Sequence, residues 1–287
     1  MTRAHLEGFE EEKLDQWLFR PLSHPVAVAA AKLGLTPNQV SVIGMLLGVA
    51  GAYFFQFREA ALVLPGVLLF CGRNILDYAD GQLARLTGKG SPLGYFFDGL
   101  CDYVAYAAVY GFAIYGIWPD LGVWALVLGL AAGLSGGVQS AVLDFFKREY
   151  RYWALGSDKD RYESPNELRE RRDAAKGLDR MLLGLAIDYA RRQRWICGWR
   201  LDLRETWEPH RALPEFYEAY SQASRWPLKV YFLTGPNWHA YGMFVFGLMG
   251  RMDLFFWVQL VGMNVLLAIA LWWQRVLDRR LARAVAG

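Results

Sequence analysis

The chain has 287 residues, of which 54% are hydrophobic and 15% aromatic, and its formal net charge is only +3. This composition is apolar for a soluble protein of this length, and so small a charge gives no indication of a nucleic-acid partner. The three cysteines, Cys71, Cys101 and Cys197, lack the even number of a disulfide framework and the spacing of a metal site. We therefore expect an integral membrane protein.

Residues 1–35 form an N-terminal region in which apolar and charged side chains alternate over residues 8–34, and a signal for the start of a helix follows it. Trp17, Leu18 and Phe19 predict an amphipathic helix that lies along the membrane surface. The sequence TPNQ at residues 36–39 is a capping box with proline at the first helical position. The first transmembrane helix should begin there.

Six apolar segments are long enough, or nearly so, to cross a bilayer, which takes about 20 residues. They are residues 40–57, 60–82, 93–118, 121–146, 229–250 and 253–275. The connections near Arg58, Pro119 and Arg251 are very short, so the helices that they join should be antiparallel hairpins. We expect an all-α fold with helices 1–4 in residues 36–146 and helices 5–6 in residues 229–287.

Lysine and arginine predict the orientation of these helices. The short connections carry at most one such residue each, whereas the N-terminal region, the loop 83–92, the stretch 147–228 and the C-terminal tail carry most of the rest. By the positive-inside rule, both termini and residues 147–228 should be cytoplasmic.

Residues 147–228 form a charged insertion between the fourth and fifth predicted spans. The sequence SPNE at residues 164–167 is a capping box and predicts a helix that runs to about Trp195. One face of that helix carries Leu178, Leu182, Leu185 and Tyr189. Two interpretations are open: the helix packs on the cytoplasmic face of the core, or it is interfacial and grips anionic headgroups or covers the active site.

Four aspartates stand in the otherwise largely apolar and small stretch 77–102. Asp77 and Asp80 are three residues apart, and Asp98 and Asp102 are four apart, so each pair lies on one helix face. Carboxylates are expensive within a membrane and are usually functional there, and four facing one another would repel unless cations lay between them. The sequence therefore predicts a divalent metal site between the second and third spans, at their cytoplasmic end.

Gly81, Ala84, Arg85 and Gly94 complete the pattern D-x2-D-G-x2-A-R-x8-G-x3-D-x3-D. This pattern resembles the signature of the CDP-alcohol phosphotransferase family, which comprises integral membrane enzymes of phospholipid synthesis. All eight signature positions match, and chance would give this on the order of 10⁻¹⁰ times per start position. The six spans resemble the family too, whereas the insertion lies outside the resemblance.

The resemblance implies how the carboxylates are used. Asp77, Asp80 and Asp98 would ligate Mg²⁺ or Mn²⁺, with two ions expected, and Asp98 would be catalytic through them. Asp102 would be the general base, and a further ligand, because an attacking hydroxyl must lose its proton.

The resemblance places Gly81, Ala84 and Arg85 around the CDP moiety. The two small residues leave room for a nucleotide beside the backbone, and an arginine can pair bidentately with a phosphate. Asn38 would lie near the nucleotide, although it is equally well explained as a residue of the helix start.

The acceptor site is less defined by sequence. Arg73, four residues before Asp77, could either pair with the carboxylates or bind a phosphate of the acceptor. His239, near the start of the fifth span, could line the acceptor pocket or be a hydrogen-bonded structural residue. Basic residues at cytoplasmic helix ends follow from topology and could also hold a phosphorylated acceptor; they are Lys147, Arg148, Lys229, Arg275 and Arg279.

The reaction implied by the resemblance is attack of an alcohol on the phosphorus distal to cytidine, with release of CMP. Chain length and span number favour CDP-diacylglycerol as donor to a small polar alcohol such as inositol, inositol phosphate, glycerol phosphate or serine. The opposite direction would be transfer from CDP-choline or CDP-ethanolamine to diacylglycerol. Aspartates in membrane helices also occur in ion or proton transporters and in intramembrane prenyltransferases, whose acidic motifs lack the Gly-x-x-Ala-Arg continuation. A scaffold without catalytic activity is a further hypothesis.

Small residues four apart suggest close contacts between helices. The pairs Gly44/Gly48 and Gly129/Gly133 have this spacing. They could serve packing within the chain or a dimer, and the family resemblance implies a homodimer.

Overall fold

The computed structural model describes residues 6–9, 17, 19–90 and 93–286, and this part of the chain is helical without a strand. The first five helices are α1 (Arg20–Lys32), α2 (Pro37–Ala52), α3 (Ala60–Thr87), α4 (Gly94–Leu121) and α5 (Val123–Trp153). The insertion contains α6 (Pro165–Ala174), α7 (Gly177–Asp202), α8 (Arg204–Trp207) and α9 (Pro214–Phe232). The chain ends with α10 (Pro236–Leu248), α11 (Met252–Trp257) and α12 (Met263–Ala286).

Within the described residues, five helices are long and apolar enough to cross a membrane. They are Pro37–Gln56, Ala60–Thr87, Phe96–Leu121, Val123–Trp153 and Met252–Val285. The prediction of a helical protein with several apolar spans is confirmed. Of the predicted amphipathic N-terminal helix, α1 is described and Trp17 is exposed, whereas Leu18 lies outside the described residues.

The predicted fifth span, residues 229–250, is not one continuous helix. Helix α9 ends at Phe232, and α10 starts at Pro236 after the extended residue Gly235. Proline has no backbone N–H and is favoured at the first position of a new helix, so it separates the two. With 13 residues, α10 is about 20 Å long, which is shorter than the hydrocarbon core of a bilayer.

Both predicted capping boxes are present. The prediction of one helix from residue 164 to about residue 195 is wrong, because the structure has two helices there. Thr36 caps α2 and Ser164 caps α6, each with the reciprocal side-chain contact. The chain leaves the helical conformation at Ala175 and re-enters it at Gly177, whose φ of 56° is in the left-handed region. Glycine adopts this conformation without steric cost, so the chain can turn here. The helices α6 and α7 are therefore separate.

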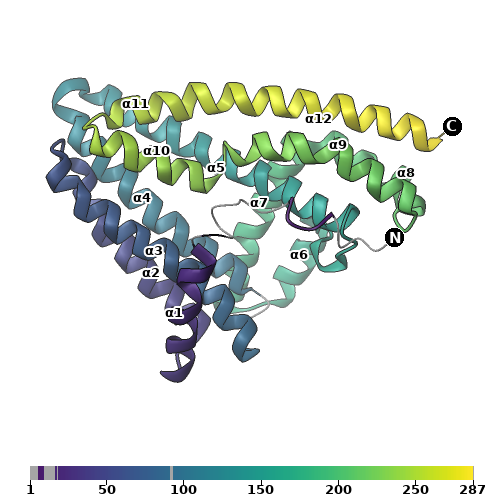
Figure 1. The fold of residues 1–287 in the computed structure, drawn as a ribbon, viewed down its shortest axis with the longest axis horizontal. Coiled ribbons are helices and arrows are strands. Elements are labelled where there is room, and N and C mark those ends of the chain that lie inside the picture. The colour runs from purple at the N-terminus through teal and green to yellow at the C-terminus, as the bar shows by residue number, and fades with distance from the viewer. Residues whose placement is uncertain (1–5, 10–16, 18, 91–92, 287) are drawn as a thin grey trace.

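The short connections after α2, α4 and α10 meet at one end of the molecule (Figure 1). Arg58 forms an ion pair with Asp120, and a Cβ placed on Gly250 would lie 2.6 Å from the backbone oxygen of Arg58. The insertion lies toward the opposite end, where α12 packs along α9. The core therefore consists of hairpins with their tight turns on one side and the insertion on the other.

A buried ionic cluster joins the insertion to the long helices. Arg200 of α7 is fully buried, pairs with Asp278 of α12, and lies 3.7 Å from a carboxylate oxygen of Glu149 on α5. It also donates a hydrogen bond to the hydroxyl of Tyr220 on α9, while Arg204 pairs with Glu149. Four helices are thus fixed together through one guanidinium.

Gly48 lies at a close approach of α2, α3 and α4. A Cβ on this residue would be 2.9 Å from the Cβ of Ala105 and 3.2 Å from Cγ of Arg73. At Gly44, a Cβ would meet that of Leu76 at 3.4 Å. This pair of glycines therefore serves helix packing within the chain.

Gly48→Ala is expected to destabilise the protein by about 1–3 kcal/mol, because α4 or the Arg73 side chain must move to admit one methyl group. The Tm in detergent should fall by several degrees. Gly111→Ala is the matched control on α4, since a Cβ there meets no atom within 4 Å. Equal melting temperatures for the two variants would contradict the packing argument.

Candidate active site

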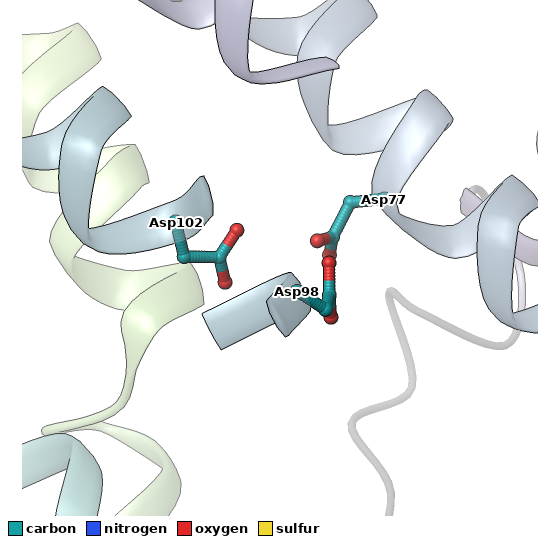
Figure 2. Close-up of side chains that lie close together, drawn as sticks. All are labelled: Asp77, Asp98 and Asp102. Atoms are coloured by element: carbon teal, nitrogen blue, oxygen red, sulfur yellow. The ribbon is translucent and has the colours of Figure 1, made fainter. Parts of the chain in front are cut away.

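Three of the four aspartates converge between α3 and α4. One carboxylate oxygen from each of Asp77, Asp98 and Asp102 lies within 4.8 Å of the others. Asp77 comes from α3, whereas Asp98 and Asp102 are one turn apart on α4, and their carboxyl groups turn toward a common space (Figure 2). The four-residue spacing on α4 thus puts both carboxylates on the face that meets α3.

Asp80 lies beside this triad and is directed toward α2. It is 6% exposed, and its Oδ2 accepts a 2.5 Å hydrogen bond from the hydroxyl of Ser41. Its carboxyl group also lies close to that of Asp98. Asp80 therefore connects α2 to the triad.

Arg73 is buried within the carboxylate cluster. Its guanidinium forms an ion pair with Asp102 and lies 3.6 Å from a carboxylate oxygen of Asp77. Nη1 donates a 2.8 Å hydrogen bond to Oδ1 of Asn74, and the guanidinium lies 5.6 Å from the centre of the Tyr106 ring. Of the two interpretations of Arg73, these contacts correspond to pairing with the carboxylates.

The donors in this cluster suit a hard divalent cation. Carboxylate oxygens are preferred ligands of Mg²⁺ and Mn²⁺. Among the described residues, the group with metal-holding geometry contains only aspartates. The single guanidinium of Arg73 cannot neutralise four neighbouring carboxylates, so bound cations would supply the missing positive charge.

The predicted CDP-binding residues lie on the last turns of α3 and at the start of α2. Gly81, Ala84 and Arg85 are within one turn, and Nη1 of Arg85 would lie 3.7 Å from a Cβ on Gly81. Asn38, the second residue of α2, is half-buried. A cavity of about 580 Å³ between α1 and α3 is lined by Arg20, Pro21, His24, Gln82 and Arg85.

A second cavity, of about 570 Å³, lies between α4, α5, α7 and α10. Asp98 and Asp102 are in its wall, so it adjoins the carboxylate cluster. Asp144 and Lys147 of α5 and His239 of α10 also line it. A molecule in this cavity could place a hydroxyl group beside Asp102.

Uncharged polar side chains form a hydrogen-bonded network at this cavity. Nε2 of Gln139 donates 3.0 Å hydrogen bonds to the backbone oxygen of Gln259 and to Oδ1 of Asn264. Oε1 of Gln139 lies 2.9 Å from Nε2 of His239, and the hydroxyl of Tyr110 donates to Gln259. Gln259 belongs to a π-helical segment, Val258–Gly262, between α11 and α12, and its buried Nε2 has no hydrogen-bond partner. His239 is thus both hydrogen-bonded and at the cavity wall.

The sequence argument did not identify Ser41, Gln139, Gln259 or Arg192 as site residues. The first three are isolated polar residues in apolar spans, and that is the signal that could have identified them. Arg192 stands in a group of arginines, and nothing local separates it from its neighbours.

Residues 34–147 match the family described as CDP-alcohol phosphatidyltransferase. An archaetidylinositol phosphate synthase of Pyrococcus horikoshii is 40% identical over 30% of this chain and 45% of its own length. Phosphatidylinositol phosphate synthases of Mycobacterium marinum and Mycolicibacterium smegmatis are 30% and 31% identical, over 54% and 51% of this chain and 64% of their own length.

These matches cover less than two thirds of each of the three relatives. The family match contains all four aspartates and the glycine, alanine and arginine of the signature. It ends at residue 147, before α6–α9. Residues 34–147, which hold the carboxylate cluster, are therefore similar to the CDP-alcohol phosphatidyltransferase family.

Proposed function

We propose that this protein is a membrane enzyme that transfers a phosphatidyl group from CDP-diacylglycerol to a hydroxyl of inositol phosphate and releases CMP. The observation that carries the proposal is the convergence of Asp77, Asp98 and Asp102 at the wall of a cavity of about 570 Å³. The names of the three relatives favour inositol phosphate over the other small alcohols.

The carboxylates would hold the cations on which the reaction depends. Asp77, Asp98 and Asp102 would be ligands, with Asp80 beside them. When bound, Mg²⁺ or Mn²⁺ neutralises pyrophosphate charge and makes the phosphorus more electrophilic. Gly81, Ala84 and Arg85 would contact the CDP moiety, and Arg85 can pair with a phosphate through two N–H groups.

Asp102 would act as the general base. The acceptor hydroxyl gives its proton to this carboxylate as its oxygen forms a bond to the phosphorus that carries the diacylglycerol group. The bond from that phosphorus to the bridging oxygen breaks, and CMP leaves with the electron pair. Arg73 fixes the position of the Asp102 carboxylate through its ion pair.

We also propose that both termini and the insertion are cytoplasmic, and that α10 makes a sixth crossing with the residues that precede it. Arg58, in the short connection after α2, forms an ion pair with Asp120 near the end of α4, and both lie at the end of the bundle opposite the insertion. The basic tail of α12 and the arginines of α6 and α7 lie away from those turns. This distribution is what the positive-inside rule expects.

Purified protein in detergent with Mg²⁺ is expected to release CMP from CDP-diacylglycerol when inositol 1-phosphate is added, and to lose this activity with EDTA. CDP-choline and CDP-ethanolamine, each with diacylglycerol, are the comparison donors, and inositol, glycerol 3-phosphate and serine the comparison acceptors. Release of CMP only from CDP-choline or CDP-ethanolamine would mean that the donor carries the headgroup and that diacylglycerol is the acceptor. Turnover that survives complete removal of the metal would refute the proposed role of the aspartates.

A further inference from the structure

One wall of the cavity beside the carboxylates comes from outside the family match. Leu185, Tyr189 and Arg192 of α7 line it together with Asp98 and Asp102. The family match ends at residue 147, so α7 belongs entirely to the inserted part of the chain. The insertion is therefore in contact with the space beside the carboxylates.

Helix α7 is held firmly on α5 next to this wall. Gln193 is 1% exposed, and its Nε2 donates a 3.0 Å hydrogen bond to the backbone oxygen of Ala141 and lies 3.5 Å from a carboxylate oxygen of Asp144. Ile187 and Cys197 on the same helix are buried in the adjoining apolar core. These contacts fix the position of Arg192, the residue before Gln193.

The guanidinium of Arg192 lies over a part of α5 that has no side chain. Its Nη1 would be 4.0 Å from a Cβ on Gly137, and both residues line the cavity. Nη2 pairs with Asp188 at 2.7 Å, whereas Nε is buried and has no hydrogen-bond partner. A guanidinium carries five N–H donors in a planar fork, so the pair with Asp188 leaves capacity for an anion.

The charged groups at this wall include both signs. Lys147 lines the cavity from α5, with its ammonium 5.6 Å from the Phe232 ring centre. Asp144 also lines it, and Asp188 pairs with Arg192. An anion that entered would therefore meet two cations with uncommitted donor capacity, and a phosphate monoester has the charge and oxygen geometry that an arginine fork binds best.

We propose that the inserted helix α7 determines acceptor specificity, with Arg192 binding the phosphate of the acceptor and Lys147 assisting. The inference rests on the proposed function for the identity of the acceptor. Arg192 is a specificity-determining residue: it binds the end of the acceptor remote from the reacting hydroxyl, which lies beside Asp102. If Arg192 did no more than pair with Asp188, its replacement would change the stability of the protein slightly and would not change acceptor binding, because partly exposed ion pairs contribute little.

The test is the affinity of the full-length protein for inositol 1-phosphate, measured by calorimetry without CDP-diacylglycerol. Arg192→Gln should weaken binding by roughly 10–100-fold, the usual effect of losing a charge-assisted contact. Arg192→Lys should restore part of the affinity. Arg191→Gln, which removes the same charge from an exposed position on α7, should bind as the wild type does.

Kinetics supply a second readout. Arg192→Gln should raise KM for inositol 1-phosphate and leave KM for CDP-diacylglycerol unchanged. Gly137→Val adds a side chain against the guanidinium from α5 and should raise the same KM. It tests the site even if Arg192→Gln folds poorly, which the Tm would reveal.

The outcomes separate the two proposals. If the wild type binds inositol 1-phosphate through Arg192 but releases no CMP, the proposed function fails and the binding site stands. If the wild type turns over and Arg192→Gln and Gly137→Val bind the acceptor as it does, the assignment of α7 is overturned and the reaction stands. Wild-type protein that binds no phosphorylated acceptor overturns the assignment as well.

Discussion

Asp98→Asn is expected to lower the rate of CMP release by about 10³-fold or more, while the protein remains folded and inserted in the membrane. Asp98 contributes one of the three converging carboxylates and lies close to Asp80, so its replacement removes charge at the centre of the cluster. Asparagine has nearly the same shape, and packing should be preserved. The measurement is CMP release by purified variant and wild type at saturating Mg²⁺.

The control for this experiment is a second aspartate on the same helix. Asp120 lies at the far end of α4, where it pairs with Arg58 and is largely exposed. Asp120→Asn should leave the rate within about twofold of wild type, because an exposed ion pair contributes little to stability. Comparable loss in both variants would mean that the effect comes from α4 as a whole and that Asp98 has no special role.

Arg200→Met is expected to destabilise the protein by about 3–5 kcal/mol, because it removes one partner of a buried ion pair. Asp278 and Glu149 are each 1% exposed, and Asp278 would keep hydrogen bonds from Gln274 and Trp199 but lose its cation. For a chain of this size, the loss corresponds to a Tm lower by about 10 °C. Thermal unfolding in detergent measures it.

A surface arginine of the same insertion provides the comparison. Arg171 on α6 pairs with Glu163 at 2.6 Å, with 44% of its side chain exposed. Arg171→Met should change the Tm by no more than about 2 °C. If the two variants melted alike, the buried cluster would not be what joins the insertion to α5 and α12.

The carboxylate cluster could be predicted from sequence because its information is local. Asp98 and Asp102 share a helix face by spacing alone, and the turn between α3 and α4 is short enough to return the chain beside Asp77. The caps at Thr36 and Ser164 were predictable for the same reason, since a capping box lies within four residues. Hydropathy identified the apolar helices.

The remaining features depend on contacts between distant segments. The break between α9 and α10 falls in a stretch whose apolar composition reads as one span, and Pro236 is a weak signal inside it. Only the folded chain shows Gly137 beneath Arg192, 55 positions apart by residue number. Likewise, nothing in the sequence around Arg200 distinguishes it from other basic residues, and only the fold shows its ion pair with Asp278. Such pairs are set by tertiary packing, which helical periodicity does not encode.

The π-helical segment Val258–Gly262 also constrains how the gene can change in length. With α11 and α12 it forms one helix, Met252–Val285, that is long and apolar enough to cross a membrane. This helix carries Gln259 at the cavity and Asp278 in the ionic cluster. Because a π-helical turn closes one residue later than an α-helical turn, deleting one residue from the segment would convert it to an α-helix and leave everything beyond it facing in nearly the same direction. Asp278 would then stay against Arg200, so the segment should tolerate the loss of one residue. A one-residue deletion in α12 before Asp278 would instead turn that carboxylate by about 100° away from Arg200 and should be excluded.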